Sequence, residues 1–520
     1  MKNQENERNR GDTRKSEKLY HGITHLRDEI VEEAGNPVRE EALSSTRCAR
    51  RYSPSLRWGA LAACLCAAVI GLWALRGFDA SSGQEGGGNS GANGTAQFLA
   101  AEAVYPKMAA YPEEDKYLTP TGELKDEFND DYHAWWEDVR ARRDQPEAHS
   151  AGLDAFLQKS VRQFLSGAGD GNRVYSPLNV YLALGMLAEV TGGESRAQIL
   201  DLLGADSMEA LREQASAVWN TSYRDDGVTK SVLASSLWLD DDFPYTQSTL
   251  NTLAETYYAS TYQGDMGTEA YNQALRDWLN AQTGGLLSDQ AAGLALDPEA
   301  VLALATTIYF RAKWSNEFYE GNTSSKTFNA PSGDMACDFM HQEGSRDYFW
   351  GDRFSSVSQR LENDGAMWFL LPDEGVTPED LLNDPEVLSF LTGAWETWEN
   401  QKDMMVNLSV PKFDVSSDQN LLSGLAALGV TAVLNRETAD FSPLTPQPNG
   451  LFLSQASHAA RAAIDEEGCT AAAYTVMALS GGGEPMGETI DFTLDRPFLF
   501  VITGSNGLPL FTGIVNQPVQ

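Results

Sequence analysis

The sequence has few cysteines and few basic residues. Its 520 residues include five cysteines, and only Cys337 and Cys469 lie beyond residue 78. Two cysteines so far apart do not make a disulfide framework, and the C-x-x-C spacing of zinc sites does not occur. A net charge of −36 leaves no basic face for phosphate contacts, which argues against a nucleic-acid-binding protein. Stability must therefore come from an apolar core.

The sequence also lacks the motifs of several enzyme classes. It has no H-E-x-x-H metal motif, no Walker loop, no G-x-S-x-G nucleophile and no dinucleotide-binding fingerprint. His458 could serve as general base for a nearby serine in a membrane-bound hydrolase. A single histidine in an apolar stretch is more often a hydrogen-bonded core residue. We therefore expect no catalytic residue, no metal and no cofactor.

The charge that is present is unevenly distributed. Residues 1–78 hold 13 basic and 10 acidic residues, whereas the other 442 hold 25 and 64. Residues 58–75 form an uncharged run of 18 residues, which as a helix just crosses a bilayer core. Arginines precede this run, so the positive-inside rule predicts a single-pass membrane protein with a cytoplasmic N-terminus and an extracellular acidic body. A cleaved signal peptide, a lipoprotein box ending at Cys64 and a buried core helix are the alternatives.

Composition divides the rest of the chain into segments. The Gly/Ser-rich segment 79–97 should behave as a flexible tether. The acidic, aromatic segment 98–150 should form an extension packed on the main domain. Apolar spacing predicts an amphipathic helix over Glu17–Ala34 in the tail. The segments are 1–57 (cytoplasmic tail), 58–75 (transmembrane helix), 79–97 (linker), 98–150 (extension) and 151–520 (main domain).

Hydrophobic periodicity in the body predicts an α+β fold, because helices concentrate early and strands late. The predicted helices cover 126–143, 153–164, 179–190 and 195–203. The predicted strands cover 231–239, 306–310, 366–371, 404–410, 451–454, 498–503 and 508–515.

Six motifs, in order, resemble the serpins, the serine protease inhibitor family. They span Leu153 to Gln520, and the acidic Trp-Trp extension resembles that of gut-bacterial serpins, here with an N-terminal membrane anchor. The motifs are VYSPLN at 174–179 with the helix after it, TIYFRAKW at 307–314, LLPDEG at 370–375, VPKFDVSSDQNL at 410–421, Ser457-His458 with IDEEGCTAAAYTV at 464–476, and RPFLF at 496–500 with the ending LPLFTGIVNQP.

The resemblance implies a fold, with a central antiparallel-rich sheet, surrounding helices and an exposed reactive loop. It also implies that a target serine protease attacks this loop and forms a covalent acyl complex, after which the cut loop inserts into the central sheet. The inhibitor would act as a monomer and would not be an enzyme. By the same resemblance, the loop hinge comprises Glu466, Glu467, Gly468, Cys469, Thr470, Ala471, Ala472 and Ala473. The shutter and breach beneath the loop comprise Ser176, Asn179, Thr306, Trp314 and His458.

Two departures from the family pattern bear on this expectation. Cys469 stands where the family usually has threonine, and an exposed thiol there would be open to oxidation. The shutter has Asn179 and Thr306 where other residues are common. We expect His458 to bond to Ser176, Asn179 or Thr306 beneath the central sheet.

The loop sequence suits insertion into a sheet. Strand residues alternate between faces, and the alternate set that starts at Cys469 is uncharged, with small or flexible side chains. No proline occurs between Gly468 and Glu484. A surface loop that never inserts, in a non-inhibitory serpin-fold binding or structural protein, is the alternative.

The cleaved bond is less sharply predicted. Counting forward from the hinge gives Gly482–Gly483, and counting back from RPFLF gives Met486–Gly487, with Leu479 or Ser480 as further candidates. No Arg or Lys occurs between Cys469 and Thr489, which argues against trypsin-like targets. Elastase-like, chymotrypsin-like and subtilisin-like proteases are the expected classes.

Overall fold

The structure, a computed structural model, describes residues 22–23, 92–143, 150–227, 229–285, 292–362, 365–454, 456–469 and 488–518. The chain divides into two compact units, of which one joins residues 1–27 to residues 91–520. The other unit, residues 28–90, lies outside the described ranges. Within the described ranges no helix combines the length and the apolarity of a membrane span. The predicted span at 58–75 is not among them.

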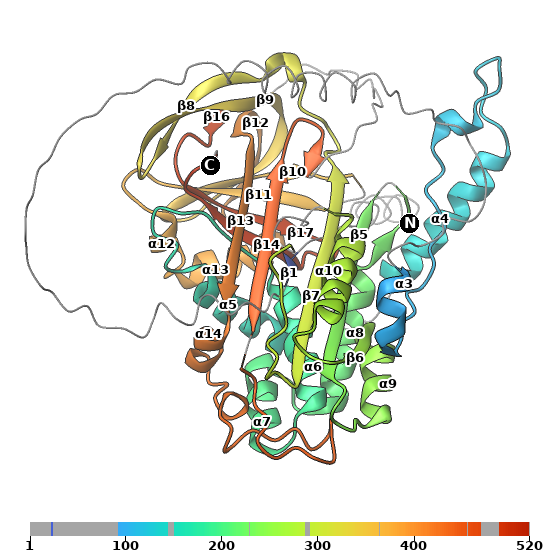
Figure 1. Ribbon diagram of the computed structural model, residues 1–520. Coiled ribbons are helices and arrows are strands. Elements are labelled where there is room, and N and C mark those ends of the chain that lie inside the picture. Colours follow the sequence, from blue (N-terminus) through green and yellow to red (C-terminus); the bar gives the residue numbers. More distant parts are fainter. Residues whose placement is uncertain are drawn as a thin grey trace, which may run out of the picture. The chain divides into compact units, whose positions relative to one another are not determined.

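The first sheet holds nine strands within the described residues, in the order β1-β14-β15-β7-β5-β6-β2, with β13 beside β14 and β4 beside β5 (Figure 1). Neighbours run antiparallel except β5 and β6. Its strands are β1 (Gly22–Ile23), β2 (Leu99–Ala101), β4 (Arg224–Asp225), β5 (Lys230–Asp240), β6 (Ala259–Gly264), β7 (Leu302–Lys313), β13 (Phe413–Asn420), β14 (Ser457–Ile464) and β15 (Gly468–Cys469).

The second sheet, again counted over the described residues, has the order β16-β12-β9-β10-β11-β17-β18-β3, with β8 beside β9. Only β12 and β16 pair in parallel. Its strands are β3 (Arg173–Tyr175), β8 (Ser324–Ala330), β9 (Gly333–Trp350), β10 (Phe354–Arg360), β11 (Ala366–Pro372), β12 (Gln401–Pro411), β16 (Thr489–Thr493), β17 (Phe498–Thr503) and β18 (Pro509–Val515).

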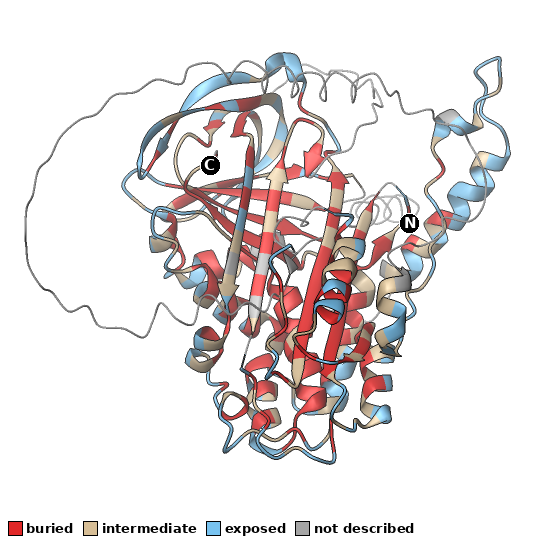
Figure 2. Cartoon of the chain, in the orientation of Figure 1, coloured by how far each residue is buried: buried red, intermediate tan, exposed pale blue. Residues whose placement is uncertain are grey.

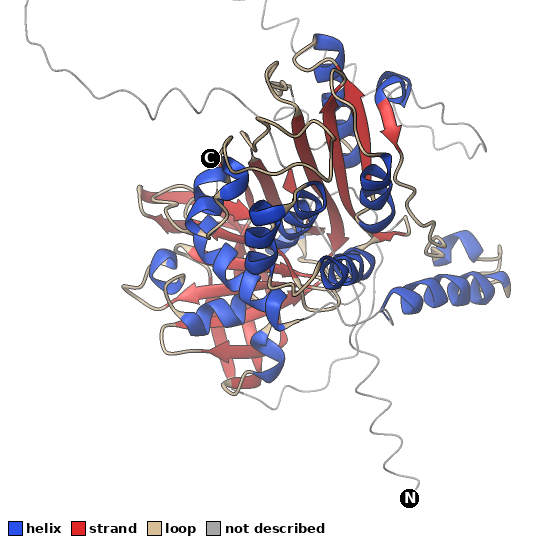
Figure 3. Ribbon diagram, turned by 90° about the horizontal axis from the view of Figure 1, so that it is seen from below, coloured by secondary structure: helices blue, strands red, loops and turns tan. Residues whose placement is uncertain are grey.

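The central strands are buried on both faces because helices cover them. All of β5 except its two end residues is buried, which matches its nearly continuous apolar sequence (Figure 2). Figure 3 shows most of the helices gathered against the strands, whereas α4 lies away from them and packs on α8. The helices are α3 (Ala92–Thr95), α4 (Glu127–Arg143), α5 (Ala151–Leu165), α6 (Pro177–Val190), α7 (Gly193–Leu203), α8 (Met208–Ser222), α9 (Gln247–Thr256), α10 (Glu269–Thr283), α12 (Pro378–Leu381), α13 (Pro385–Leu391) and α14 (Leu422–Ala427).

Helix α6 lies at the centre of the core. Pro177 occupies its first turn, where a missing backbone N–H costs no hydrogen bond. Nearly every residue of α6 is buried, since the helix packs against β7 of the first sheet and β18 of the second. It therefore connects the two sheets mechanically.

Most predicted elements are confirmed, namely the four helices (as α4 to α7) and six of the seven strands. The strand predicted at Leu451–Ser454 is wrong. Leu453 donates its N–H to the Val433 carbonyl rather than to a strand, so the segment has the apolar pattern without a sheet partner.

Two N-terminal predictions also need correction. Gly22 and Ile23 are extended rather than helical, because they pair with β14 and β7; the rest of the predicted helix over Glu17–Ala34 lies outside the described residues. The last residues of the predicted linker, 92–97, form α3 and the start of a 3-10 turn. The packing of α3 against α10 explains why these residues are helical rather than part of a linker.

Candidate functional site

The junction between β14 and β7, which we name the β14–β7 seam, is joined differently from its neighbours. On one side β7 pairs with β5 from Leu302 to Arg311. Across the seam, by contrast, β15 contacts β7 at Ala312 and Lys313, and β1 contacts it at Thr307. Rows 308–311 of β7 lie between these two contacts, so two short strands provide the pairing described across the seam.

A tight turn directs the chain from β14 back into the seam. Oδ1 of Asp465 accepts hydrogen bonds from the N–H groups of Glu467 (3.0 Å) and Gly468 (3.1 Å), and the Asp465 N–H donates to the Gly468 carbonyl (3.0 Å). A Cβ at Gly468 would lie 2.3 Å from the Ala312 carbonyl oxygen. Position 468 therefore needs glycine, because β15 approaches the β7 backbone too closely for a side chain.

Trp314, which directly follows β7, holds this turn in place through hydrogen bonds. Its backbone N–H donates to the Glu467 carbonyl (3.0 Å) and its indole Nε1–H to the Asp465 carbonyl (2.8 Å). The side chain is buried and makes an edge-on contact with Phe318. The predicted breach residue thus holds the hinge turn through two hydrogen bonds.

Glu466 joins the same turn to two segments that lie outside the strands. Its carboxylate forms an ion pair with Lys412 Nζ (2.7 Å) and accepts a hydrogen bond from the Thr323 hydroxyl (2.7 Å). Burial of Glu466 opposes its ionisation, but the Lys412 and Thr323 contacts outweigh burial and lower the pKa of the carboxyl. The hinge is therefore held by a charged group that is ionised at neutral pH.

Cys469 is the last described residue of the hinge. Its side chain is 3% exposed, between Ile464 of β14 and Ala312 of β7 in register. Burial raises the pKa of its thiol well above the ordinary value, with a smaller contribution from Asp465. Only the thiolate reacts readily, so in this conformation Cys469 is protected from the oxidation that exposure would allow.

The expected contact between His458 and Ser176 is present, made through the Ser176 backbone. Nε2 of His458 accepts a hydrogen bond from the backbone N–H of Ser176 (3.0 Å), and its ring meets Tyr175 edge-on. The donor is the backbone rather than a hydroxyl, and the imidazole is fully buried. Asn179 and Thr306 are buried as well. Because its Nε2 already accepts a bond in the core, His458 is not placed as a general base.

The predicted reactive loop lies outside the described residues. This holds for Thr470, Ala471, Ala472 and Ala473 of the hinge and for the predicted bond candidates Leu479, Ser480, Gly482, Gly483, Met486 and Gly487. The chain is described again from Glu488, which pairs with Lys402 (2.5 Å), and β16 then runs parallel to β12. The loop therefore leaves the first sheet at β15 and enters the second at β16.

The register of β15 defines where further loop residues would pair in the seam. Since Gly468 lies opposite Lys313 and Cys469 opposite Ala312, counting on places residue 474 opposite Thr307. That row now holds Ile23 of β1, which pairs with both Thr307 and Ala459. Insertion beyond residue 473 would thus require β1 to leave.

Sequence reasoning missed three residues of this site: Asp465, Lys412 and Thr323. Lys412 and Asp465 lie inside recognised motifs, but their roles depend on pairing between distant segments. Thr323 carries no sequence signal, because it belongs to the segment between β7 and β8 and reaches Glu466 only in the fold.

Among the described residues, one cluster of carboxylates is close enough together to hold a metal ion: Asp240, Asp241 and Asp242. Two of these side chains are exposed, and Asp240 Oδ1 accepts the Asp242 N–H (2.8 Å). The cluster is therefore explained as a turn at the end of β5.

Comparison with known proteins places this geometry in a family. A family model described as Serpin (serine protease inhibitor) matches residues 151–518. Serpin-Z1C of Triticum aestivum is 28% identical over 365 residues, which cover 67% of this chain and 90% of the relative. Alpha-1-antitrypsin 1-5 of Mus musculus is 28% identical over 396 residues, covering 74% and 92%.

Solved structures agree at the level of the fold. The thermophilic serpin tengpin in the native state has a TM-score of 0.62 at 24% identity, covering 70% of this chain and 93% of that one. Thyroxine-binding globulin in complex with thyroxine has a TM-score of 0.60 at 23% identity, covering 71% and 99%.

Proposed function

Because the chain belongs to the serpin family, we propose that it inhibits serine proteases as a suicide substrate. The family consists mostly of protease inhibitors that are consumed rather than catalytic, and the predicted hinge sequence is of the inserting kind. The observation that carries the proposal is β15: Gly468 and Cys469 already lie as a strand in the β14–β7 seam. A loop that starts inside the seam has a defined path along which to insert.

The chemistry begins with the protease's serine attacking a carbonyl carbon of the loop. The acyl-enzyme forms as the peptide C–N bond breaks and the new amine takes a proton, which frees the C-terminal part of the loop. Residues after Cys469 then add to the seam, pairing with β7 and β14, before water can release the enzyme. The residues of the cut loop join a sheet in this step, which makes insertion favourable and the uncleaved fold metastable.

A non-inhibitory role is the second candidate. Thyroxine-binding globulin, whose structure this fold resembles, binds a small molecule. The two functions differ in one measurable property. An inhibitory chain gains thermal stability when its loop is cut, because the loop inserts, whereas a chain whose loop stays outside the sheet gains none.

The target class follows from the loop sequence. We expect elastase-like, chymotrypsin-like or subtilisin-like proteases, with cleavage at Gly482–Gly483 or Met486–Gly487, or beside Leu479 or Ser480. The test is incubation of the purified chain with an elastase, followed by denaturing electrophoresis and mass spectrometry of the released C-terminal peptide. A complex that survives boiling supports inhibition, and the mass of the released peptide identifies the cleaved bond. Degradation without a complex across a protease panel contradicts it.

We also propose that residues 58–75 anchor the chain in a membrane as a single-pass protein with the inhibitor domain outside. Its likeness to anchored gut-bacterial serpins and its monomeric state stay predictions. This topology excludes the pairing of β1 with β14 and β7, because Gly22 and Ile23 would lie across the membrane. Protease protection in sealed vesicles separates the two arrangements: an N-terminal tag protected from external protease supports the anchor, and a digested tag contradicts it.

A further inference from the structure

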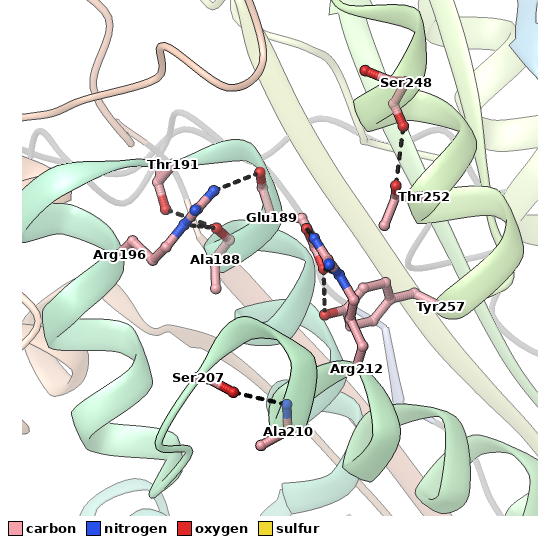
Figure 4. Close-up of polar contacts among 10 residues, drawn as sticks. All are labelled: Ala188, Glu189, Thr191, Arg196, Ser207, Ala210, Arg212, Ser248, Thr252 and Tyr257. Carbon is pink, nitrogen blue, oxygen red and sulfur yellow. Dashed lines mark hydrogen bonds and ion pairs between the residues drawn. The ribbon is translucent and has the colours of Figure 1, made fainter.

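Charged side chains that are buried within the described residues are each paired with an opposite charge. Figure 4 shows one case, in which Glu189 of α6 lies between Arg212 of α8 and Tyr257. Arg212 donates to both carboxylate oxygens (2.6 and 2.8 Å), and the Tyr257 hydroxyl donates to Oε1 (3.2 Å). The other buried pairs are Asp226 with Arg224 (2.6 Å) and Glu466 with Lys412 (2.7 Å). Such pairing is expected, because an isolated charge inside a protein is strongly destabilising.

Arg346 of β9 departs from this pattern. Its Nη2 donates to the amide oxygens of Gln342 and Gln359 (2.7 Å for Gln359), and both of these groups are neutral. Its Nε is buried without a hydrogen-bond partner among the described residues. Burial lowers the pKa of the guanidinium to about 10, and no neighbouring charge opposes this shift. The described part of the chain therefore holds this positive charge without a counter-charge.

The two glutamines are fixed in orientation by the segment that follows β7. Gln359 is buried, and its amide nitrogen donates to the Asn316 carbonyl (2.8 Å). The amide nitrogen of Gln342 donates to the carbonyls of Asn316 (3.1 Å) and Glu317 (2.9 Å). Because both nitrogens are engaged in this way, both amide oxygens are turned toward Arg346. The guanidinium is thus held in one place, as a preformed site requires.

Space for a ligand remains beside the guanidinium. Arg346 is only partly buried, and its Nη1 makes no hydrogen bond within the described residues. A Cβ at Gly344, two residues earlier on the same face of β9, would lie 2.9 Å from Nη1. Glycine at this position therefore keeps the surroundings of Nη1 free of a side chain. The donors of Nη1 are left for an acceptor from outside.

The same glutamines connect Arg346 to the hinge turn. Asn316 and Glu317, whose carbonyls they bind, directly precede Phe318. The N–H of Phe318 donates to the Glu466 carbonyl (2.9 Å). A counter-ion that fixes Arg346 should therefore also stabilise this segment and, through it, the turn. Its binding should be visible in the stability of the whole domain.

We propose that Arg346 is the centre of a binding site for a small oxyanion, with inorganic phosphate as the simplest example. A guanidinium binds oxyanions through charge-assisted hydrogen bonds, which are stronger than bonds between neutral groups. The bound anion would supply the opposite charge that Gln342 and Gln359 cannot. This inference does not depend on protease inhibition, since it follows from the position and the charge of Arg346.

The test measures the thermal midpoint of the full chain in detergent while phosphate replaces chloride at constant ionic strength. We expect the wild-type midpoint to rise and then to level off as the site fills. Phosphate also stabilises proteins in general through exclusion from their surface, an effect that all variants share. Arg346→Gln should lose the saturating part of the response. The matched control, Arg461→Gln, removes an arginine already paired with Asp414 and should keep it. A wild-type response without saturation, or one equal to that of Arg346→Gln, overturns the site.

A second variant covers the case in which Arg346→Gln does not fold. Gln359→Glu places a carboxylate where the amide oxygen now lies 2.7 Å from Nη2, so the charge is compensated within the chain. We expect it to weaken phosphate binding at least about tenfold, measured by calorimetry against the wild type. Undiminished binding overturns the site. If phosphate binds Glu484→Gln but not the wild type, the loop's own carboxylate uses the guanidinium, and the proposed ligand is wrong. Complex formation with elastase, measured separately, tests the proposed function alone.

Discussion

The two sheets of this protein have similar sizes but differ in how completely their strands are joined. In the second sheet, β12 and β9 pair over an unbroken register from Gln401–Phe349 to Pro411–Phe339. In the first sheet, β14 and β7 are bridged by the two-residue strands β15 and β1. The continuous ladder between β12 and β9 has no place for another strand, whereas only short strands pair across the seam. Under the proposed function, we therefore expect conformational change to occur in the first sheet, with the second as its platform.

The largest effect is expected when a charge is placed on the loop segment that would insert into the first sheet. Cys469 is buried, so residues of its alternate set should face the core on insertion. Ala471→Arg would place a charge there, and we expect it to abolish the covalent complex and turn the inhibitor into a substrate. Ala472→Arg, one residue on, faces the other way and should retain most inhibition. The ratio of covalent complex to cleaved inhibitor, measured on denaturing gels, distinguishes the two variants. An equal ratio for both would contradict the register of β15.

The next largest effect is expected at Gly468, where the chain enters the seam of the first sheet. Gly468→Ala puts a methyl group 2.3 Å from the Ala312 carbonyl oxygen, so β15 should leave the sheet. We expect alkylation of Cys469 to become about tenfold faster, since its thiol is then exposed. Gly171→Ala, whose Cβ would have 3.4 Å to its nearest neighbour, is the control. Unchanged alkylation in Gly468→Ala would mean that the seam accommodates the methyl group.

The sequence predicts elements well where one segment carries the whole signal. Helix α6 and strand β5 are long apolar stretches and were predicted close to their bounds. Strand β9 was not predicted, because its burial alternates irregularly and polar residues fill much of it. Leu451–Ser454 has the opposite problem, an apolar pattern that finds no strand to pair with.

The site shows the same limit. Family motifs identify His458, Trp314 and the hinge, and the structure brings them to one seam. The lock of Glu466 by Lys412 and Thr323 joins three distant segments, so no local pattern could predict it. The contacts of Tyr105 with Trp219 and Tyr223 depend likewise on how the chain before it pairs along β6. Pairing across the fold, rather than residue type, is what the sequence leaves open.

The smallest expected effect is the pH dependence of the hinge lock. The folded pKa of Glu466 lies below its ordinary value of 4.5, so its stabilisation is complete above that value and is lost as pH falls through the lowered folded pKa. Glu466→Gln should therefore destabilise the fold at pH 7 by roughly 1 kcal/mol, seen as a lower thermal midpoint, and its difference from the wild type should shrink as pH falls through the lowered pKa.

Glu488 provides the control, because it forms an ion pair with Lys402 at the other end of the loop but is fully exposed. Solvent screens such a pair, so Glu488→Gln should leave the thermal midpoint almost unchanged at either pH. A difference between Glu466→Gln and the wild type that stays constant as the pH is lowered would show that the amide disturbs packing. A difference that vanishes on acidification assigns the effect to the carboxylate's charge. The lock at the entrance of the seam would then be electrostatic, unlike the apolar packing that holds the second sheet.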